Sequence, residues 1–334
     1  SCNGTKNLAG DGTPMTAAAD DEAGRDVEHG PSALIFALVA LACGHMLSTL
    51  LRTIPALSLD LMAADFHVQP QALGSLTSVY HFAFAASQIP VGAAMDRFGV
   101  RPVSLSLLAG TVVGAIASGL ATGPASFAFG QLLLGIATSG MLMCPMTLAA
   151  KQMSAAKFGL WSGLILSIGN IGMLLSASPL AFVVDQLGWR AGFWLSAGFG
   201  IVVLIAVFAL VPRQPAAHAD ESSPLRQMAE VLRLGLSRGL RGLIALSLVS
   251  LGASLVLRGL WAGPWLMDVK GLSRIEAGNV LGLFTLAMIV GPACIGAFDR
   301  KFGHRRTVVA ATHAVAALLL VVMAGGAPHF PVSN

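Results

Sequence analysis

Two arginines lie inside long apolar stretches, where a charged side chain is costly to place. Arg52 follows Leu51 in the first apolar run, and Arg258 follows Leu257 in a later one. A charge at the centre of a membrane helix costs about 2.5–3.5 kcal/mol on insertion scales, so it usually has a partner. The guanidinium fork suits carboxylate or phosphate oxygens. The pair therefore predicts a positively charged cleft for an anion. The open alternative is that each arginine reaches the membrane surface or is satisfied internally.

Other residues share the helical faces of these arginines. His45 and Ser48 precede Arg52 at helical spacing, which places the three side chains on one side of a helix. Trp261 follows Arg258 by about one turn and is a candidate wall of the same site, although tryptophan also suits a membrane interface. We therefore predict that these residues contact a substrate, with helix packing as the alternative for the serine.

Two other apolar runs contribute polar side chains. Tyr80, the only tyrosine of the chain, lies one turn before Phe84. Asn170 stands between Gly169 and Gly172, and small residues let membrane helices approach closely. We take Tyr80 and Asn170 as candidate substrate contacts. For Asn170, satisfying a polar group at a close helix crossing is an equally good interpretation.

The composition defines the class of protein that must position these residues. Of 334 residues, 55% are hydrophobic and 11% are charged, and the mean hydropathy is +0.76. Soluble domains contain about 25% charged residues. The apolar runs reach the length of about 20 residues that a membrane-spanning helix needs. We predict an all-α polytopic membrane protein with about nine spans, at residues 32–59, 71–95, 102–122, 125–149, 158–184, 190–211, 242–267, 273–297 and 306–325.

The spacing of these spans divides the chain into four parts. Residues 1–31 are polar and acidic, which predicts a disordered cytoplasmic tail. Residues 32–211 hold six spans, residues 212–241 form a linker, and residues 242–334 hold three. By analogy with the first half, three further spans would be missing from the second. We therefore expect a fragment or a truncated reading frame, with a natural nine-span protein as the alternative.

Lysine and arginine placement predicts the orientation in the membrane. Connections after even-numbered spans contain 13 of these residues, and connections after odd-numbered spans contain three. Positive residues favour the cytoplasmic side, so the N-terminus is expected inside a plasma or inner membrane. The net charge of +4 reflects this asymmetry and does not indicate nucleic-acid binding.

A ten-residue phrase occurs twice, which indicates an internal duplication. The first copy runs Gly-Ala-Ala-Met-Asp-Arg-Phe-Gly-Val-Arg over residues 92–101, and the second runs Gly-Ala-Phe-Asp-Arg-Lys-Phe-Gly-His-Arg over 296–305. The copies begin 40 and 38 residues after the buried arginines. Glycine permits close packing and a tight turn, the aspartate suits a helix N-terminus or an arginine, and the arginines hold the turn in the cytoplasm. The candidate conformational residues are Gly92, Asp96, Arg97, Gly99, Arg101, Gly296, Asp299, Arg300, Gly303 and Arg305.

This repeated phrase resembles the loop motif of the major facilitator superfamily. Gln88-Ile-Pro90-Val-Gly92 before the first copy and Gly188-Trp189-Arg190 reinforce the likeness, which covers residues 32 to about 325. The resemblance implies two six-helix bundles around a central site that opens alternately to each side. The arginines on the first and seventh spans are similar to those of organophosphate/phosphate antiporters, which implies that Arg52 and Arg258 bind substrate.

Departures from the family pattern narrow the expected function. Gln131 stands where an arginine is common on the fourth span, and the glycine-proline signature of drug antiporters is not met. We expect a monomeric transporter of a small organic or inorganic anion, without cofactor, metal or nucleic acid, and no enzymatic activity. Alternatives are a nitrate/nitrite-like porter, a drug or metabolite exporter and, from another class, a non-transporting membrane sensor.

Overall fold

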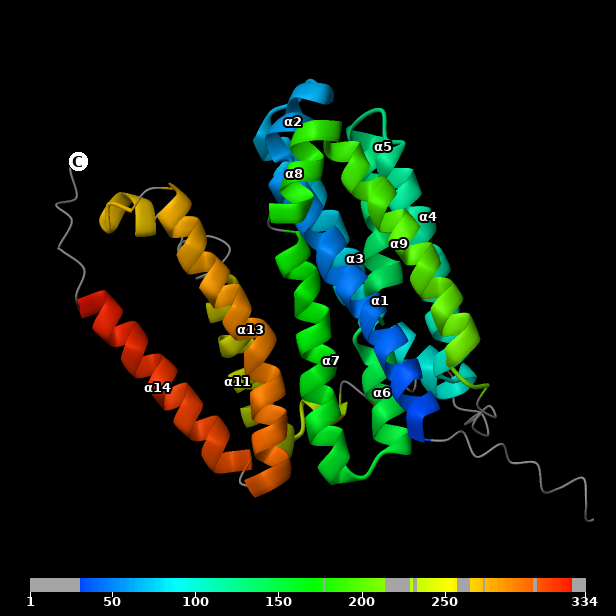
Figure 1. The fold of residues 1–334 in the computed structure, drawn as a ribbon, viewed down its shortest axis with the longest axis vertical. Coiled ribbons are helices and arrows are strands. Elements are labelled where there is room, and N and C mark those ends of the chain that lie inside the picture. Colours follow the sequence, from blue (N-terminus) through cyan, green and yellow to red (C-terminus); the bar gives the residue numbers. More distant parts are fainter. Residues whose placement is uncertain are drawn as a thin grey trace, which may run out of the picture.

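The computed structural model describes residues 31–176, 178–213, 229–230, 233–256, 265–272, 274–302 and 305–325. Within these ranges every regular element is a helix, as the composition predicted (Figure 1). Some predicted site residues lie outside this part of the chain, namely Arg258, Trp261 and Gly303. Nothing is described for three more side chains of the second motif copy, those of Asp299, Arg300 and Arg305.

The first half contains nine helices where six spans were predicted. They are α1 (Pro31–Leu57), α2 (Leu59–Asp65), α3 (Pro70–Phe98), α4 (Val100–Gly119), α5 (Pro124–Thr138), α6 (Met143–Gln152), α7 (Ala155–Leu175), α8 (Ser178–Leu187) and α9 (Trp189–Leu210). The predicted span 125–149 corresponds to α5 and α6, which are separated by a turn. The predicted span 158–184 corresponds to α7 and α8.

The second half contributes α11 (Arg238–Val256), η2 (Trp265–Val269), α13 (Arg274–Phe302) and α14 (Arg305–Gly325). Six helical stretches among the described residues are long and apolar enough to cross a membrane, five in the first half and one in α13. A shorter apolar stretch lies in α14, at Thr307–Val322. The structure is therefore that of a polytopic membrane protein, while the count of nine spans stays a prediction.

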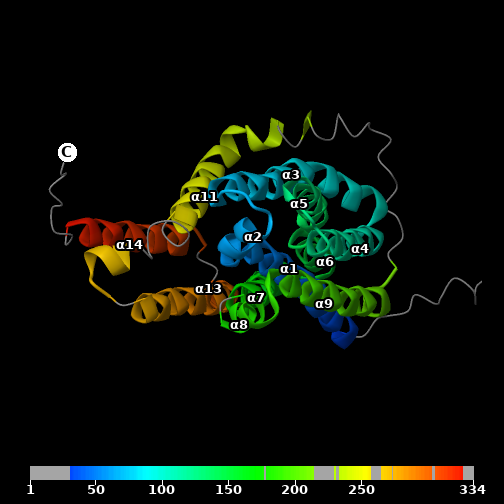
Figure 2. The ribbon, with the colours of Figure 1, turned by 90° about the horizontal axis from the view of Figure 1, so that it is seen from above.

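Among the described residues, α7 is the helix of the first half that makes the main contact with the second half. It packs against α1 on one side and against α13 on the other, as the view along the helices shows (Figure 2). Within the first half, α4 packs against both α5 and α9, and α3 packs against α5. The core of the first half forms two clusters, one around Leu38, Met95 and Leu148 and the other around Leu51 and Phe127. This packing fixes α1, α3 and α7, the helices that hold the candidate site.

The first copy of the repeated phrase forms the turn between α3 and α4. Gly99 joins the two helices with a φ of +83°, a conformation that suits glycine because it has no Cβ. Arg101 then fixes the start of α4 to the end of α9, because its Nη2 donates a hydrogen bond to the Phe208 carbonyl at 2.7 Å. Carbonyls in the last turn of a helix lack an intrahelical donor, so this contact satisfies one of them.

Substituting Gly99 tests the conformational requirement at this turn. Gly99→Ala is expected to destabilise the protein by about 1–2 kcal/mol, because an L-residue is strained at this φ. A Cβ would meet no atom within 4 Å, so steric overlap contributes nothing. Thermal unfolding in detergent measures the change. The control is Gly198→Ala within α9, where the Cβ also meets open space; equal stabilities of the two variants would refute the requirement.

Candidate functional site

Arg52 lies in the last two turns of α1 and reaches toward α3. Its Cζ is 4.9 Å from the centroid of the Phe84 ring, which is a cation–π contact. Its Nε is buried and has no hydrogen-bond partner among the residues that the structure describes. A buried donor without a partner costs about 1–3 kcal/mol, and more when it is charged. The Arg52 guanidinium therefore lies with one face against an aromatic ring, and its buried Nε is a donor that no described residue satisfies.

Tyr80 supports this arrangement from beneath Phe84. The two rings are stacked, with centroids 6.0 Å apart and an interplanar angle of 22°. The Tyr80 hydroxyl is 2.7 Å from Thr138 Oγ1, and Thr138 donates its own proton to the Leu134 carbonyl at 2.7 Å. The Tyr80 hydroxyl is thus the donor to Thr138, so its proton is engaged within the protein. Tyr80 positions Phe84, and its predicted contact with substrate stays a prediction.

The other two candidates on α1 are more deeply buried than Arg52. His45 is 8% exposed, and its ring lies against Gly169 of α7 so closely that a Cβ on that glycine would overlap it. Ser48 is 1% exposed. Gly172 likewise approaches the backbone of Met46. The small residues of α7 therefore make the close helix crossing that the sequence indicated, here with α1.

Asn170 lies on α7 at the contact with α13. Its Nδ2 donates a hydrogen bond to the Met288 carbonyl of α13 at 2.6 Å. The neighbouring Gly169 carbonyl accepts a hydrogen bond from Thr49 Oγ1 of α1, also at 2.6 Å. The structure thus gives Asn170 a helix-to-helix contact, which was one of its two sequence interpretations. Its predicted contact with substrate stays a prediction.

Sequence reasoning missed several residues of this region. Thr138, Met288 and Pro292 were not singled out, and only Pro292 carried a signal, since a proline inside a span removes one backbone donor. His313 in α14 was missed as well, although a histidine in an apolar run is itself a signal. Its Nε2 lies 2.7 Å from Ser250 Oγ of α11.

The repeated phrase occupies the ends of α3 and α13. In the first copy Asp96 is exposed and has no ion-pair partner among the described residues, and Arg97 lies 5.4 Å from the Phe98 ring centroid. A Cβ on Gly92 would meet open space. In the second copy a Cβ on Gly296 would come within 2.6 Å of the Gly159 carbonyl. The predicted latch at Asp96 stays a prediction, and the glycine of the second copy is a helix contact.

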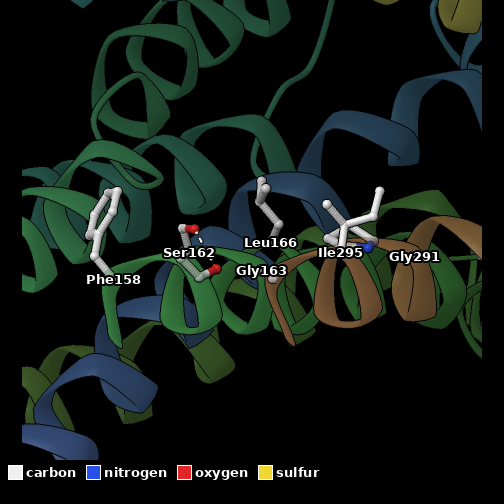
Figure 3. A pocket seen from close by; sticks show the side chains of 9 residues that line it. Phe158, Ser162, Gly163, Leu166, Gly291 and Ile295 are labelled. Carbon is white, nitrogen blue, oxygen red and sulfur yellow. Dashed lines mark hydrogen bonds between the residues drawn. The ribbon is translucent and has the colours of Figure 1, made fainter. Parts of the chain in front are cut away.

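A cleft of about 480 Å³ lies beside this helix contact. Figure 3 shows Ser162 and Gly163 of α7 on one wall and Gly291 and Ile295 of α13 on the other. The Ser162 hydroxyl is bonded to the Gly159 carbonyl of its own helix. None of the described residues that line this cleft is charged, so they do not offer the chemistry that Arg52 offers to an anion.

The geometry agrees with the family that the repeated phrase indicated. A family model described as Major Facilitator Superfamily matches residues 41–333. The chain belongs to this superfamily. The human organic anion transporter MFSD10 (TETRAN), a solved structure, aligns with a TM-score of 0.52 at 16% identity, covering 80% of this chain and 72% of that one. This similarity shows a shared fold.

Two relatives are similar in sequence. The tetracenomycin C resistance and export protein of Streptomyces glaucescens is 26% identical, over 80% of this chain and 59% of its own length. A protein of Bacillus subtilis (strain 168), whose name assigns it to niacin/nicotinamide transport, is 26% identical over 73% of this chain and 61% of its own length. The chain therefore spans about three fifths of the length of these relatives.

Proposed function

We propose that the chain forms the anion-binding part of a secondary transporter that carries a small organic anion by alternating access. The observation behind this proposal is Arg52, whose guanidinium rests on Phe84 and whose buried Nε finds no hydrogen-bond partner in the described part of the chain. A carboxylate that accepts from the Nε edge would satisfy this donor and neutralise the charge in one step. In an environment of low dielectric constant, that gain discriminates strongly in favour of anions.

The sequence relatives support transport of small molecules. One is named for export of tetracenomycin C and the other for niacin/nicotinamide transport. Niacin contains a carboxylate next to an aromatic ring, so it combines a partner for Arg52 with a flat apolar surface. This combination fits a guanidinium that lies against the Phe84 ring, which itself stacks on Tyr80. Arg258 is proposed as the second cationic contact, as predicted from its position on the seventh span.

The placement in the cell is part of the same proposal. The excess of lysine and arginine in alternate connections supports an N-terminus in the cytoplasm. The site at Arg52 then lies in the outer half of the membrane, since α1 runs outward from Pro31 to Leu57. We propose a monomer in the plasma or inner membrane.

Export of a drug or metabolite is the second candidate. It is favoured by the relative that is named for resistance and export. The two candidate functions differ in whether the ligand must carry a negative charge. An anion transporter needs an anionic ligand to pair with Arg52, and an exporter does not.

Matched ligand pairs test the proposed function. We expect niacin and benzoate to raise the unfolding temperature of the purified protein by several degrees, because a ligand that binds only the native state stabilises it. Nicotinamide and benzamide, which have the same rings without the charge, are expected to have no effect. Stabilisation by the amides equal to that by the carboxylates would contradict an anion site.

A further inference from the structure

Helix α13 contains a backbone carbonyl that its own helix cannot satisfy. Pro292 lies within α13 and has no N–H group, so the carbonyl of Met288, four residues earlier, has no intrahelical donor. In hydrocarbon, water cannot take the place of this donor, and an unsatisfied carbonyl costs several kcal/mol. Asn170 Nδ2 supplies the missing hydrogen at 2.6 Å from the opposite helix. The asparagine and the proline thus form one unit across the contact of the two halves.

Between Met288 and the C-terminal end of α13 at Phe302, α13 and α7 touch through their backbones. A Cβ on Gly163 would overlap the Pro292 carbonyl oxygen, and a Cβ on Gly296 would come within 2.6 Å of the Gly159 carbonyl. No side chain separates the helices at these points. Such a glycine contact can separate without leaving a polar group unsatisfied, because its carbonyls keep their own helical bonds. The Asn170 contact cannot separate in this way, because the Asn170 amide and the Met288 carbonyl would each lose a hydrogen-bond partner.

The Asn170 contact is also tied to the helix that holds Arg52. The hydroxyl of Thr49 on α1, three residues before Arg52, shares its one proton between the carbonyl of Gly169 at 2.6 Å and that of Met46 on its own helix at 2.8 Å. Asn170 lies near the middle of the combined α7–α8 span, and Met288 lies near the middle of α13. The hydrogen bond therefore crosses the interface at mid-membrane depth, where two halves that rock against each other move least.

We propose that Asn170 is a positioning residue of the transport cycle, and that its hydrogen bond to the proline-freed Met288 carbonyl is the fixed point about which the two halves re-orient. The glycine contact between 159–163 and 292–296 is the part that opens. The role of Asn170 in the transport cycle rests on the proposed transport function. The hydrogen bond between Asn170 and Met288 does not depend on that function, and thermal unfolding measures it separately.

A double-mutant cycle with Pro292 tests this inference. Asn170→Ala is expected to lower the niacin transport rate in proteoliposomes about tenfold. This is the effect of losing one hydrogen bond between membrane helices whose free energy lies near the upper end of the range for such bonds. The half-saturating niacin concentration is expected to stay within about twofold of its original value, because the Asn170 amide is engaged by the Met288 carbonyl and the proposal has it act on re-orientation. Pro292→Ala restores an N–H to the Met288 carbonyl, so Asn170→Ala in that background is expected to cost less than about twofold.

Ser167→Ala is the control, because the Ser167 hydroxyl bonds only to the Gly163 carbonyl of its own helix in the described structure. Thermal unfolding is measured for the same cycle, which consists of the unaltered protein, Asn170→Ala, Pro292→Ala and the double variant. Asn170→Ala is expected to lower the unfolding temperature only where Pro292 is present. Equal losses in both backgrounds, in rate and in unfolding temperature, would overturn the inference. So would an Asn170→Ala protein that matches the unaltered one in both. If the unaltered protein does not transport niacin, the transport proposal fails for this probe while the unfolding cycle still decides the contact.

Discussion

Replacing Arg52 by alanine is expected to abolish anion uptake while leaving the protein in the membrane. The guanidinium is the charged group in the described part of the candidate site, and truncating one partner of a buried charge pair costs about 2–5 kcal/mol, or roughly thirty- to several-thousand-fold. Uptake of radiolabelled niacin into vesicles measures the loss. Insertion is expected to be unaffected or improved, because a charge inside an apolar span opposes insertion.

Arg52→Lys is the matched variant for this prediction. Lysine keeps the charge but loses the planar fork and the Nε donor, so we expect weakened uptake rather than none. Phe84→Leu removes the ring under the guanidinium and is expected to raise the half-saturating concentration without abolishing transport. If Arg52→Ala transported niacin at the original rate, Arg52 would have only a structural role.

Gly163→Ala is expected to have the second largest effect. The added methyl group would overlap the Pro292 carbonyl oxygen of α13, and backbone cannot move aside as a flexible side chain can. Helices α7 and α13 must therefore separate, which weakens the Asn170 hydrogen bond a few residues away. We expect a loss of transport of at least about tenfold and a lower unfolding temperature, since overpacking typically costs 1–3 kcal/mol.

Gly282→Ala on α13 is the control for this steric effect. A Cβ there meets open space, so the same change of residue type is expected to be neutral or slightly stabilising. Normal transport and stability of Gly163→Ala would mean that α7 and α13 do not pack as the structure has them. An equal loss in both variants would point to glycine itself rather than to the helix contact.

The presence of membrane-spanning helices could be predicted from the sequence, because long apolar runs are enough to indicate them. Composition and run length predicted the apolar helices, and the repeated phrase predicted the family. Helix breaks were harder to predict: the predicted span 125–149 is interrupted between Thr138 and Met143, within an apolar run that has no proline before Pro145. Hydropathy averages over such a turn, because Met141 and Leu142 keep the window apolar although Ser139 and Gly140 precede them.

The partners of the site residues could not be read from the sequence. Helical spacing grouped His45 and Ser48 with Arg52, and the structure adds that both are more deeply buried than Arg52 because neighbouring helices cover this part of α1. Their predicted contacts with substrate stay predictions. The crossing at Gly169 and Gly172 was predicted from small residues. That Asn170 faces Met288, 118 residues away, depends on how the two halves dock, which no local pattern encodes.

Equilibrium binding of niacin to the purified protein and to its Arg52→Gln variant tests the central claim most directly. Glutamine keeps a polar side chain of similar reach and removes the charge. We predict saturable binding to the unaltered protein and a loss of affinity of at least about thirtyfold in the variant, with no binding of nicotinamide to either. Equal affinity of both proteins for niacin would contradict the claim that Arg52 binds the anion.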